Sequence, residues 1–380
     1  MDPDFPKPPP GGALVPAAHA LNLRILSDGL AGHDAQTLGI AAALGLEPDI
    51  RRIHPRKFFE LLAPFGPLDW RERENRAGSP IAPPWPDIAL GAGRRVLPYL
   101  KRLKRASGRQ VFTVYVNRPA TGRTAADLIV APLHDGFFGP NVVTPITPAN
   151  RVSPELLARL RRDPDPRVAA LPAPCAALLV GGDNRHFKFT PPVGLALQEA
   201  ARALFAAGFG VMATASRRTP PAIIEALRTA LAEGPGWLWD GEGENPYFSM
   251  LAAADLILVT ADSVSMIGEA VATGAPVHIF APSGGSPKIK LFLERLQSEG
   301  AVRPWTGTPE RWSYAPINET PKIAAAIRRA YQVYKGEMPP LPAWRPENAE
   351  GLLDYDDGEN CEGDGHDMGR IAPPRSRGEG

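Results

Sequence analysis

Residues Asn245 to Phe280 read NPYFSMLAAADLILVTADSVSMIGEAVATGAPVHIF, and the order of apolar and polar residues in this stretch decides the fold. An unbroken apolar run from Leu256 to Val259 is typical of a strand that is buried on both faces of a parallel sheet. A second apolar run, Ala275 to Phe280, follows Gly274, a residue type that commonly ends a helix. The stretch therefore predicts helix, strand, helix and strand in succession, with a polar turn from Asp262 to Ser265.

The second helix of this stretch, which we expect to open near Asp262, has two faces of different character. Its apolar stripe would pack on the sheet and consists of Val264, Ile267, Gly268 and Val271. The opposite face carries Asp262, Ser265 and Glu269 and could point to a ligand. Glu269 lies about two helical turns beyond Asp262, where its carboxylate could accept both hydroxyls of a ribose. The ordinary reading, an exposed helical glutamate, stays open on sequence alone.

Apolar runs and helical patterns alternate along the rest of the chain. In the first half we expect strands at residues 23–26, 88–90, 111–116, 128–131 and 142–146, and helices at 34–44 and 94–106. In the second half we expect strands at 176–180, 211–214 and 237–239, and helices at 193–207, 220–232 and 322–334. This alternation indicates parallel sheets covered by helices on both faces. We therefore predict an α/β fold of two Rossmann-like domains, with parallel sheets facing a central cleft.

Stretches rich in proline or in charge divide the chain into predicted regions. These are a disordered Pro-rich arm at 1–20, an N-terminal Rossmann-like domain at 21–165, a linker at 166–174, a C-terminal Rossmann-like domain with the final helix at 175–335, and an acidic disordered tail at 336–380.

Charge and cysteine content narrow the class of protein. Residues 346–369 hold nine acidic residues and no Lys or Arg, so the formal charge of +1 for all 380 residues becomes +10 once that segment is set aside. A moderately basic body suits an anionic ligand or surface, and we expect no nucleic acid partner. The two cysteines, Cys175 and Cys361, predict neither a disulfide framework nor a zinc site and fit a reducing compartment. No apolar run approaches the ~20 residues of a membrane span, so we expect a cytoplasmic protein that is at most peripheral on a membrane.

The segment after the strand at 211–214 combines a basic pair with the start of a helix. Ser216 is followed by Arg217 and Arg218, then by Thr219, which we expect to cap the helix, and by Pro220 at the first helical position. Two cations before a helix N-terminus oppose the positive end of the helix dipole. A bound diphosphate would remove this conflict. A solvated basic turn, or ion pairs with neighbouring carboxylates, is the alternative.

Two further loops carry glycines where a strand ends. Gly284 and Gly285 stand shortly before Lys288 and the start of a helix, and glycines allow a backbone to approach a phosphate closely. An ordinary turn would have the same composition. The loop at 181–186 adds two more glycines and an Asp-His pair that could bind a metal but more readily orients the loop or ligand hydroxyls.

The first predicted strand ends in a polar loop that precedes a helix. This loop reads Ser27-Asp28-Gly29-Leu30-Ala31-Gly32-His33. His33 could act as a general base near neutral pH. A histidine that caps or packs at the turn is an equal alternative. His134, after a later strand, is a second and weaker candidate of the same kind.

Four segments of the chain together resemble the mitochondrial fission ELM1-like family. They are SDGLAGHDAQTLG at 27–39, LLVGGDNRHFKF at 178–189, ATASRRTPP at 213–221 and NPYFSMLAAADLILVTADSVSMIGEAVATGAPV at 245–277. The family is named for plant members that act in organelle division, and its bacterial members are regarded as glycosyltransferases of the GT-B type. The resemblance therefore implies a GT-B-like fold, with an acceptor on the N-terminal domain and a nucleotide sugar on the C-terminal domain.

The same resemblance implies roles for individual residues. Ser263 and Ser265 would hold a diphosphate at a helix N-terminus, and Glu269 would hold the ribose. The Gly32-His33 pair would face the acceptor. Leu30 departs from the family pattern, in which this position is often basic.

These patterns combine into one main hypothesis, a metal-independent glycosyltransferase that moves a sugar from a nucleotide-diphospho-sugar to an unidentified hydroxyl acceptor and needs no cofactor. The expected catalytic residues are His33 as the base and Asp28 beside it. The expected substrate-binding residues are Gly29, Gly32, Gly181, Gly182, Asp183, Ser216, Arg217, Arg218, Asn245, Asp262, Ser263, Ser265, Met266, Glu269, Gly284, Gly285 and Lys288.

Two rival functions stay open. A sugar-nucleotide epimerase on the same fold would need paired acid and base groups, for which Asp183, Glu269 and His33 are candidates. A non-catalytic scaffold or division protein recruited to a membrane would need an interfacial patch. The candidates for that patch are Phe58, Phe59, Leu61 and Leu62, flanked by Arg56 and Lys57, although a buried helix would have the same composition.

Overall fold

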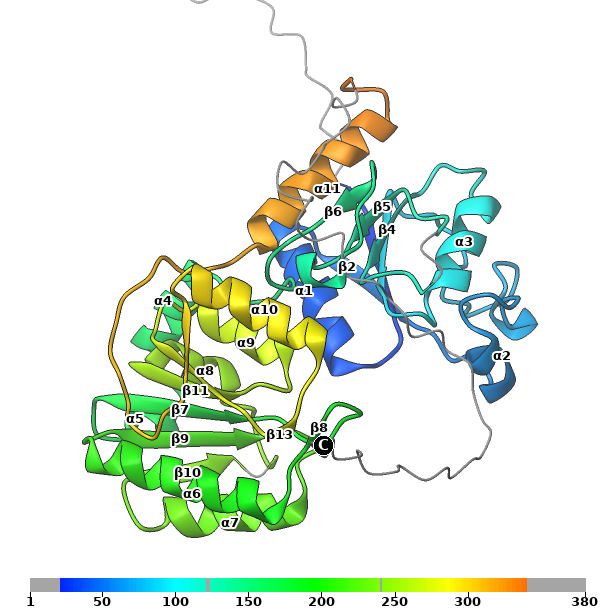
Figure 1. Cartoon of the computed structure of the whole chain (residues 1–380). Coiled ribbons are helices and arrows are strands. Elements are labelled where there is room, and N and C mark those ends of the chain that lie inside the picture. The colour runs from blue at the N-terminus through cyan, green and yellow to red at the C-terminus, as the bar shows by residue number, and fades with distance from the viewer. Residues whose placement is uncertain (1–20, 121–123, 240, 340–380) are drawn as a thin grey trace, which may run out of the picture. The chain divides into compact units, whose positions relative to one another are not determined.

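The computed structural model describes residues 21–120, 124–239 and 241–339, which contain two parallel β-sheets with helices packed around them (Figure 1). The strand orders are β2-β1-β3-β4-β5-β6 in the first sheet and β10-β9-β7-β11-β12-β14 in the second. Every pair of neighbours in both sheets is parallel. The predicted α/β class with two Rossmann-like sheets is confirmed.

The first sheet contains the predicted strands and one further strand, β2, that was not predicted. Its strands are β1 (Leu23–Ser27), β2 (Pro48–Arg52), β3 (Ile88–Ala92), β4 (Phe112–Val116), β5 (Leu128–Val130) and β6 (Val142–Val143). The helical segments between them are α1 (Ala31–Leu44), α2 (Lys57–Leu62), η1 (Trp70–Glu72), α3 (Leu97–Ala106) and η2 (Leu133–Asp135). All residues of β1, β3, β4 and β5 are buried, as expected for apolar strands inside a parallel sheet.

The second sheet contains the quoted stretch at its centre. Its strands are β7 (Cys175–Val180), β9 (Gly210–Ala215), β10 (Gly236–Trp239), β11 (Leu256–Thr260), β12 (Val277–Phe280) and β14 (Val302–Pro304). Its helices are α4 (Pro154–Arg162), α5 (Pro166–Ala169), α6 (Pro191–Ala206), α7 (Pro221–Leu231), α8 (Tyr247–Ala253), α9 (Val264–Val271) and α10 (Pro287–Ser298). The short strands β8 (Phe187–Lys188) and β13 (Ser283–Gly284) form a separate antiparallel pair.

The quoted stretch forms α8, β11, α9 and β12 in the predicted order. β11 pairs with β7 on one side and β12 on the other, and all its residues are buried. Its carboxyl end, Thr260, therefore leads directly into the polar turn at the edge of the sheet where the other parallel strands also end.

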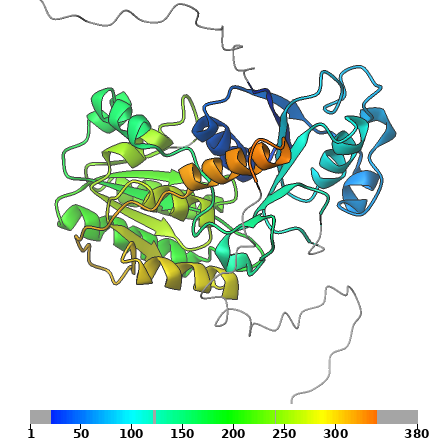
Figure 2. The same ribbon diagram turned by 90° about the horizontal axis from the view of Figure 1, so that it is seen from above.

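The last helix, α11 (Thr320–Tyr334), packs on the first sheet. Figures 1 and 2 show α11, drawn in orange, running beside α1, and its apolar side chains Ile323, Ile327 and Tyr331 belong to the core of that sheet. Helices α4 and α5, by contrast, contribute Leu157 and Val168 to the core of the second sheet. Packing thus divides the chain differently from the predicted ranges, which end the first domain at 165 and place the final helix with 175–335.

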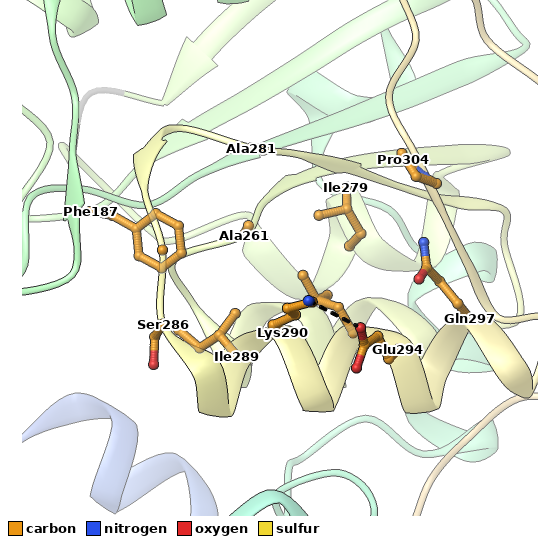
Figure 3. A pocket seen from close by; sticks show the side chains of 12 residues that line it. Phe187, Ala261, Ile279, Ala281, Ser286, Ile289, Lys290, Glu294, Gln297 and Pro304 are labelled. Carbon is orange, nitrogen blue, oxygen red and sulfur yellow. Dashed lines mark ion pairs between the residues drawn. The ribbon is translucent and has the colours of Figure 1, made fainter. Parts of the chain in front are cut away.

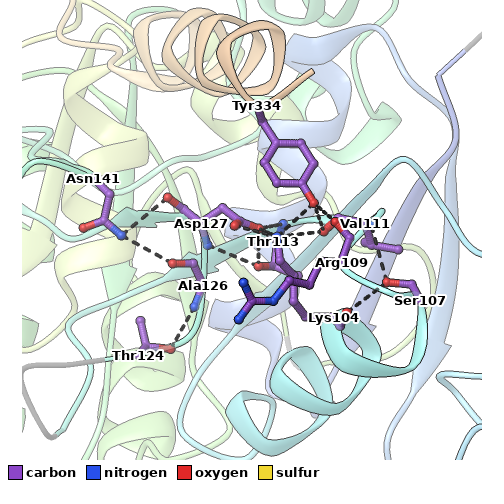
Figure 4. Close-up of polar contacts among 10 residues, drawn as sticks. All are labelled: Lys104, Ser107, Arg109, Val111, Thr113, Thr124, Ala126, Asp127, Asn141 and Tyr334. Carbon is purple, nitrogen blue, oxygen red and sulfur yellow. Dashed lines mark hydrogen bonds and ion pairs between the residues drawn. The ribbon is translucent and has the colours of Figure 1, made fainter. Parts of the chain in front are cut away.

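A polar network fixes α11 to the first sheet (Figure 4). The ammonium group of Lys104 lies 2.6 Å from Oδ1 of Asp127 and donates to the hydroxyl of Tyr334 at 3.0 Å. Asp127 in turn accepts from the backbone N–H of Thr113 at 2.8 Å, which joins β4 to the same network. Helix α11 is therefore tied to α3, to the residue just before β5 and, through that residue, to β4.

The described residues all belong to one compact unit, so the independence of the two predicted domains stays a prediction. The predicted arm at 1–20 and all but the first four residues of the predicted tail at 336–380 lie outside the described residues. Within the described ranges, no helix combines the length and apolar character needed to cross a membrane.

Candidate functional site

Three neighbouring strands of the second sheet bring predicted loops together at one edge. β9, β7 and β11 are adjacent and parallel, so the segments after them, 216–219, 181–183 and 262–265, leave the sheet on the same side. The backbone N–H of Ser216 donates to Val180 O, and the N–H of Asp183 donates to Arg218 O. The first two loops are therefore bonded to each other directly.

Asp262 contacts these loops from the interior of the protein. Its side chain is fully buried, accepts from the N–H of Gly182 at 3.0 Å and from Thr260 Oγ1 at 2.6 Å, and lies 3.9 Å from Nη2 of Arg218. Burial raises the pKa of Asp262, and these donors and the arginine only partly oppose the effect. The carboxylate of Asp262 therefore faces these loops inside the protein rather than solvent, and its expected part in ligand binding stays a prediction.

The glycines of the first loop are required by this packing. A Cβ atom on Gly181 would lie 2.2 Å from both carboxylate oxygens of Asp262, and one on Gly182 would lie 2.2 Å from the carbonyl carbon of Arg218. Thr219 also serves the loops, since its hydroxyl bonds to Gly181 O and accepts from the N–H of Ser216. Thr219 is therefore not the helix cap that we expected, and α7 opens at Pro221.

The two arginines of the basic loop differ in their surroundings. Arg218 lies near Asp262 and also contacts the carbonyl oxygen of Asp183 at 3.5 Å. Arg217 is exposed, and within the described residues its side chain has no hydrogen bond or ion pair. Asp183 is occupied by the loop itself, because it accepts from the N–H of Phe189 at 2.8 Å, which lowers its pKa. Arg217 is thus the cation of this edge that a ligand can reach unopposed.

The N-terminus of α9 is the accessible part of the quoted stretch. Ser263 is the N-cap, and its hydroxyl accepts from the N–H of Met266 at 3.4 Å. Residues 263–266 are partly exposed, whereas 267–271 are buried. The helix opens at Val264, two residues later than expected, and presents its first turn and Ser265 to the surface. A helix N-terminus of this kind attracts anions.

Glu269 lies deeper than the sequence suggested. It is 6% exposed, and Tyr247 of α8 donates a 2.6 Å hydrogen bond to its Oε2 atom. Burial raises the pKa of Glu269 to about 7, against the opposing effects of the Tyr247 hydrogen bond and the charge of Arg151. The alternative of an exposed helical glutamate is therefore wrong, and the expected contact of Glu269 with a ribose stays a prediction. Asn245, also a candidate, accepts from the N–H of Tyr247 and lies just before Pro246, the N-cap of α8.

The glycine loop after β12 has an internal use. Gly284 has a φ of 112°, and a Cβ atom there would lie 2.1 Å from the carbonyl oxygen of His186, which also accepts from the N–H of Gly285 at 2.9 Å. Lys288 lies 3.7 Å from Asp135 of η2, in the first half of the chain. The Gly285–His186 bond supports the pairing of β13 with β8, and the Lys288–Asp135 ion pair joins the two halves of the chain. The expected role of this loop in binding phosphate stays a prediction.

A pocket of about 340 Å³ lies between α10 and the ends of β11 and β12 (Figure 3). Its lining is mainly apolar and includes Phe187, Ile279, Ile289 and Leu293. The charged groups that line it, Lys290 and Glu294, lie 3.8 Å apart in an ion pair. The pocket suits an uncharged part of a ligand better than a phosphate.

Asp28 and His33 form a close pair at the end of β1. Nδ1 of His33 lies 3.0 Å from Oδ2 of Asp28, whose side chain is 2% exposed. Burial alone would raise the pKa of Asp28, but the hydrogen bond with His33 and the N–H of Leu30 lower it below its usual value. Asp28 is therefore ionised and fixes Nδ1, which leaves Nε2 of His33 as the free ring nitrogen.

Two glycines set the surroundings of this pair. Gly93, after β3, has a φ of 85°, and a Cβ atom there would lie 2.3 Å from Cε1 of His33. A Cβ atom on Gly32 would lie 3.9 Å from Oγ of Ser265. The start of α1, which carries His33, is therefore next to the start of α9 in the second sheet.

Several residues of this region were missed by sequence reasoning. Gly93 and Asn117, which follow β3 and β4, both have positive φ angles at the edge where β1 leads to Asp28. Tyr247 was part of the quoted stretch, but only the fold brings it to Glu269. Within the described part of the chain, no three His, Cys, Asp or Glu residues gather where they could hold a metal ion.

Solved structures with a similar arrangement include two proteins of known name. The UDP-GlcNAc 2-epimerase of Methanocaldococcus jannaschii matches 81% of this chain and 99% of its own at 15% identity, with a TM-score of 0.49. MurG of Acinetobacter baumannii matches 88% of this chain and 98% of its own at 15% identity, with a TM-score of 0.42.

Comparison with sequence relatives identifies the family of the chain. The mitochondrial fission protein ELM1 of Arabidopsis thaliana is 28% identical over 271 residues, which are 64% of this chain and 64% of the plant protein. An uncharacterized protein of Rickettsia prowazekii is 31% identical over 168 residues, 42% of this chain and 47% of its own. The chain thus matches less than two thirds of the length of either relative. The sequence pattern described as Mitochondrial fission ELM1 matches residues 31–331, and the chain belongs to the mitochondrial fission ELM1 family.

Proposed function

We propose that this protein is a glycosyltransferase that moves a sugar from a nucleotide-diphospho-sugar to a hydroxyl acceptor without a metal ion. The observation that carries the proposal is the buried Asp28 beside His33, with the neighbouring Gly32 close to Ser265 at the start of α9. A base with a free ring nitrogen and a helix N-terminus suited to an anion are thus next to each other. Direct displacement of a diphosphate by an acceptor hydroxyl is accelerated by both groups.

In the proposed reaction, Nε2 of His33 removes the proton of the acceptor hydroxyl while its oxygen attacks the anomeric carbon of the donor. The bond from that carbon to the diphosphate oxygen breaks, and the nucleoside diphosphate leaves with the electron pair. Asp28 keeps the proton on Nδ1 and stabilises the imidazolium that forms. His33 thus acts as the general base, and Asp28 acts as the carboxylate that orients it.

The leaving diphosphate would be stabilised by groups of the second sheet. The start of α9 and the loop that carries Arg217 lie at the same edge of that sheet, and both the N–H groups of a helix N-terminus and a guanidinium can bind a diphosphate. The hydroxyl of Ser263 is engaged with Met266, whereas the side chain of Ser265 has no hydrogen bond within the part of the chain that the structure describes, so Ser265 is the serine that we expect to contact phosphate. Glu269 would accept the ribose hydroxyls through the carboxylate oxygen that Tyr247 does not use.

Calorimetry with a panel of nucleotide sugars tests the donor site. We expect one or more of them to bind, and we expect Arg217→Ala together with Glu269→Ala to weaken that binding at least about 100-fold. Arg162→Ala is the matched control, because Arg162 is an exposed arginine on α4. Failure of every nucleotide sugar to bind, or equal binding by the double variant, would refute the proposal.

The same preparation separates the rival functions. An epimerase would convert a nucleotide sugar to its epimer with no acceptor present, which nuclear magnetic resonance of the sugar detects. A scaffold would neither bind nor convert any donor. A transferase releases nucleoside diphosphate only when its acceptor is present. We propose that these events take place in the cytoplasm, because a sequence with two cysteines predicts no disulfide framework.

A further inference from the structure

The region around α2 exposes an unusual set of large apolar side chains. Phe58, Leu61 and Phe65 are 65%, 76% and 75% exposed. Leu62 and Trp70 add further exposed apolar surface beside them. We call these five residues the α2 face. Contiguous apolar patches of several hundred Å² are uncommon on monomeric soluble proteins and mark surfaces that contact a partner.

The α2 face is held in this orientation by its own inner side. Phe59 points inward at 8% exposure, and its ring packs edge-on against Trp70 with centroids 5.4 Å apart. The guanidinium of Arg56 lies 4.1 Å from the centre of the Trp70 ring and donates two hydrogen bonds to the buried Asp69. With Phe59 filling the only inward position, Phe58 and Leu61 are directed to solvent by helical spacing. The exposure is therefore built into the fold.

The charges next to the α2 face indicate the kind of surface that it meets. Residues 48–76 carry seven Lys and Arg against five Asp and Glu. Of these cations, Lys57, Arg71 and Arg73 are exposed, and within the described ranges their side chains form no ion pair. Apolar side chains that enter the acyl boundary, ringed by cations at headgroup level, are the pattern of a helix that binds an anionic membrane surface.

The α2 face also lies on the side of the fold that carries the Asp28–His33 pair. The N–H of Ile53, just before α2, donates to Ser27 O at the end of β1. Glu60 of α2 forms an ion pair with Arg95, and the charge of Arg95 contributes to the low pKa of Asp28. A surface that docks through α2 is therefore connected with the proposed acceptor side by one ion pair.

We propose that the α2 face binds the surface of a bilayer containing anionic lipids, with Phe58, Leu61 and Phe65 inserted and Lys57, Arg71 and Arg73 among the headgroups. One consequence rests on the proposed function: the hydroxyl acceptor is an amphiphile that resides in that bilayer. The docking itself does not depend on transfer activity.

Vesicle sedimentation with the full chain tests the docking. We expect binding to vesicles of phosphatidylcholine mixed with phosphatidylglycerol, weaker binding to phosphatidylcholine alone, and loss of binding as salt is raised. Phe58→Ser with Leu61→Ser should weaken binding about tenfold or more, and Lys57→Glu should weaken it on the anionic vesicles. All three positions are exposed, and unchanged thermal melting will show that the variants fold.

Matched controls come from the second sheet. Leu195 of α6 is 62% exposed, and Arg162 of α4 is an exposed cation, so Leu195→Ser and Arg162→Glu should leave vesicle binding unchanged. A wild-type protein that stays in the supernatant with both kinds of vesicle, or controls that lose as much binding as the α2 variants, would overturn the proposal. Nucleotide-sugar calorimetry on the α2 variants should match the wild type, so failure of docking and failure of the donor site are seen separately.

Discussion

The hydroxyl of Tyr247 donates a 2.6 Å hydrogen bond to Oε2 of Glu269, a carboxylate that is almost fully buried. Tyr247 lies in α8, which precedes β11 in the chain, and Glu269 lies in α9, which follows it. The two helices contribute side chains to the same core, and this packing brings Tyr247 to Glu269. Burial holds the pKa of Glu269 at about 7, and the pair therefore changes its protonation in the physiological range. Both stability and ligand binding should respond to pH through this one group.

Glu269→Gln tests the stability effect. The pKa of Glu269 rises from 4.5 to about 7 on folding, so between these values the folded state keeps a proton that the unfolded state releases. The contribution of Glu269 to the free energy of unfolding therefore falls as pH rises through this window, by at most about 3 kcal/mol. Urea denaturation from pH 5 to 8 should show the wild type losing stability relative to Glu269→Gln. Parallel curves for the two proteins would contradict the assignment.

The same titration predicts the pH dependence of donor binding. An ionised Glu269 accepts ribose hydroxyls, whereas the protonated acid offers one acceptor fewer, so binding should tighten as pH rises through about 7. Calorimetry should show about tenfold weaker binding one unit below that pKa than well above it. Tyr247→Phe removes a hydrogen bond that lowers the pKa and should move the midpoint to higher pH. A profile that Tyr247→Phe leaves in place would exclude Glu269 as the titrating group.

The Asp28–His33 pair predicts a loss of rate without a loss of donor affinity. His33→Ala removes the proposed base and should lower kcat by about 100-fold to 10,000-fold, while donor binding in calorimetry stays within about twofold. Asp28→Asn keeps the shape but cannot stabilise the imidazolium, and it should lower kcat by about 100-fold.

Gly93→Ala tests whether the position of the His33 ring beside Asp28 matters for the rate. The new Cβ atom would lie 2.3 Å from Cε1 of His33 and force the ring away from Asp28. We expect the rate of Gly93→Ala to fall toward that of His33→Ala. A His33→Ala variant that retains the wild-type rate would remove His33 from the reaction, whatever Gly93→Ala does.

The fold was predictable where apolar runs are long and buried. β7, β9 and β11 lie within buried sheet interiors and were expected from their sequences. β2 was missed because its sequence PDIRR is polar and half exposed, as befits an edge strand with one neighbour. The packing of α11 was also beyond reach, because a helix pattern shows that a face is apolar but not which sheet it covers.

The site was predictable at the level of loops more than of side chains. Parallel strands end at one edge, so the convergence of the loops near Gly181, Arg217 and Ser263 follows from strand order alone. The roles of Asp262 and Glu269 did not follow, since helical spacing predicts a polar face but not what covers it. Residues of other segments supply that cover: Gly182, in the loop after β7, contacts Asp262, and Tyr247 of α8 contacts Glu269.

Arg217 and Arg218 should differ when they are removed singly. Arg217→Ala deletes a cation with no protein partner in the described residues, so it should weaken diphosphate binding about tenfold or more and leave stability unchanged. Arg218→Ala also leaves Asp262 without its nearby charge. Because Arg218 is half exposed and 3.9 Å away, that loss should cost at most about 1 kcal/mol. Isothermal calorimetry with UDP measures the loss of diphosphate binding, and urea denaturation measures the loss of stability. Identical results for Arg217→Ala and Arg218→Ala would show that the two arginines do not differ in these roles.

Replacement of Gly181 by alanine should reduce the free energy of unfolding, whereas the same replacement of Gly285 should leave it nearly unchanged. In Gly181→Ala the methyl group would meet both oxygens of the buried Asp262 at 2.2 Å, so the loops after β7 and β11 must separate. We expect a loss of about 3 kcal/mol in the free energy of unfolding. In Gly285→Ala the methyl group meets nothing within 4 Å, so stability should stay within about 0.5 kcal/mol. Urea denaturation measures the free energy of unfolding of both variants. Equal losses would mean that close packing against Asp262 does not hold the loops after β7 and β11 together.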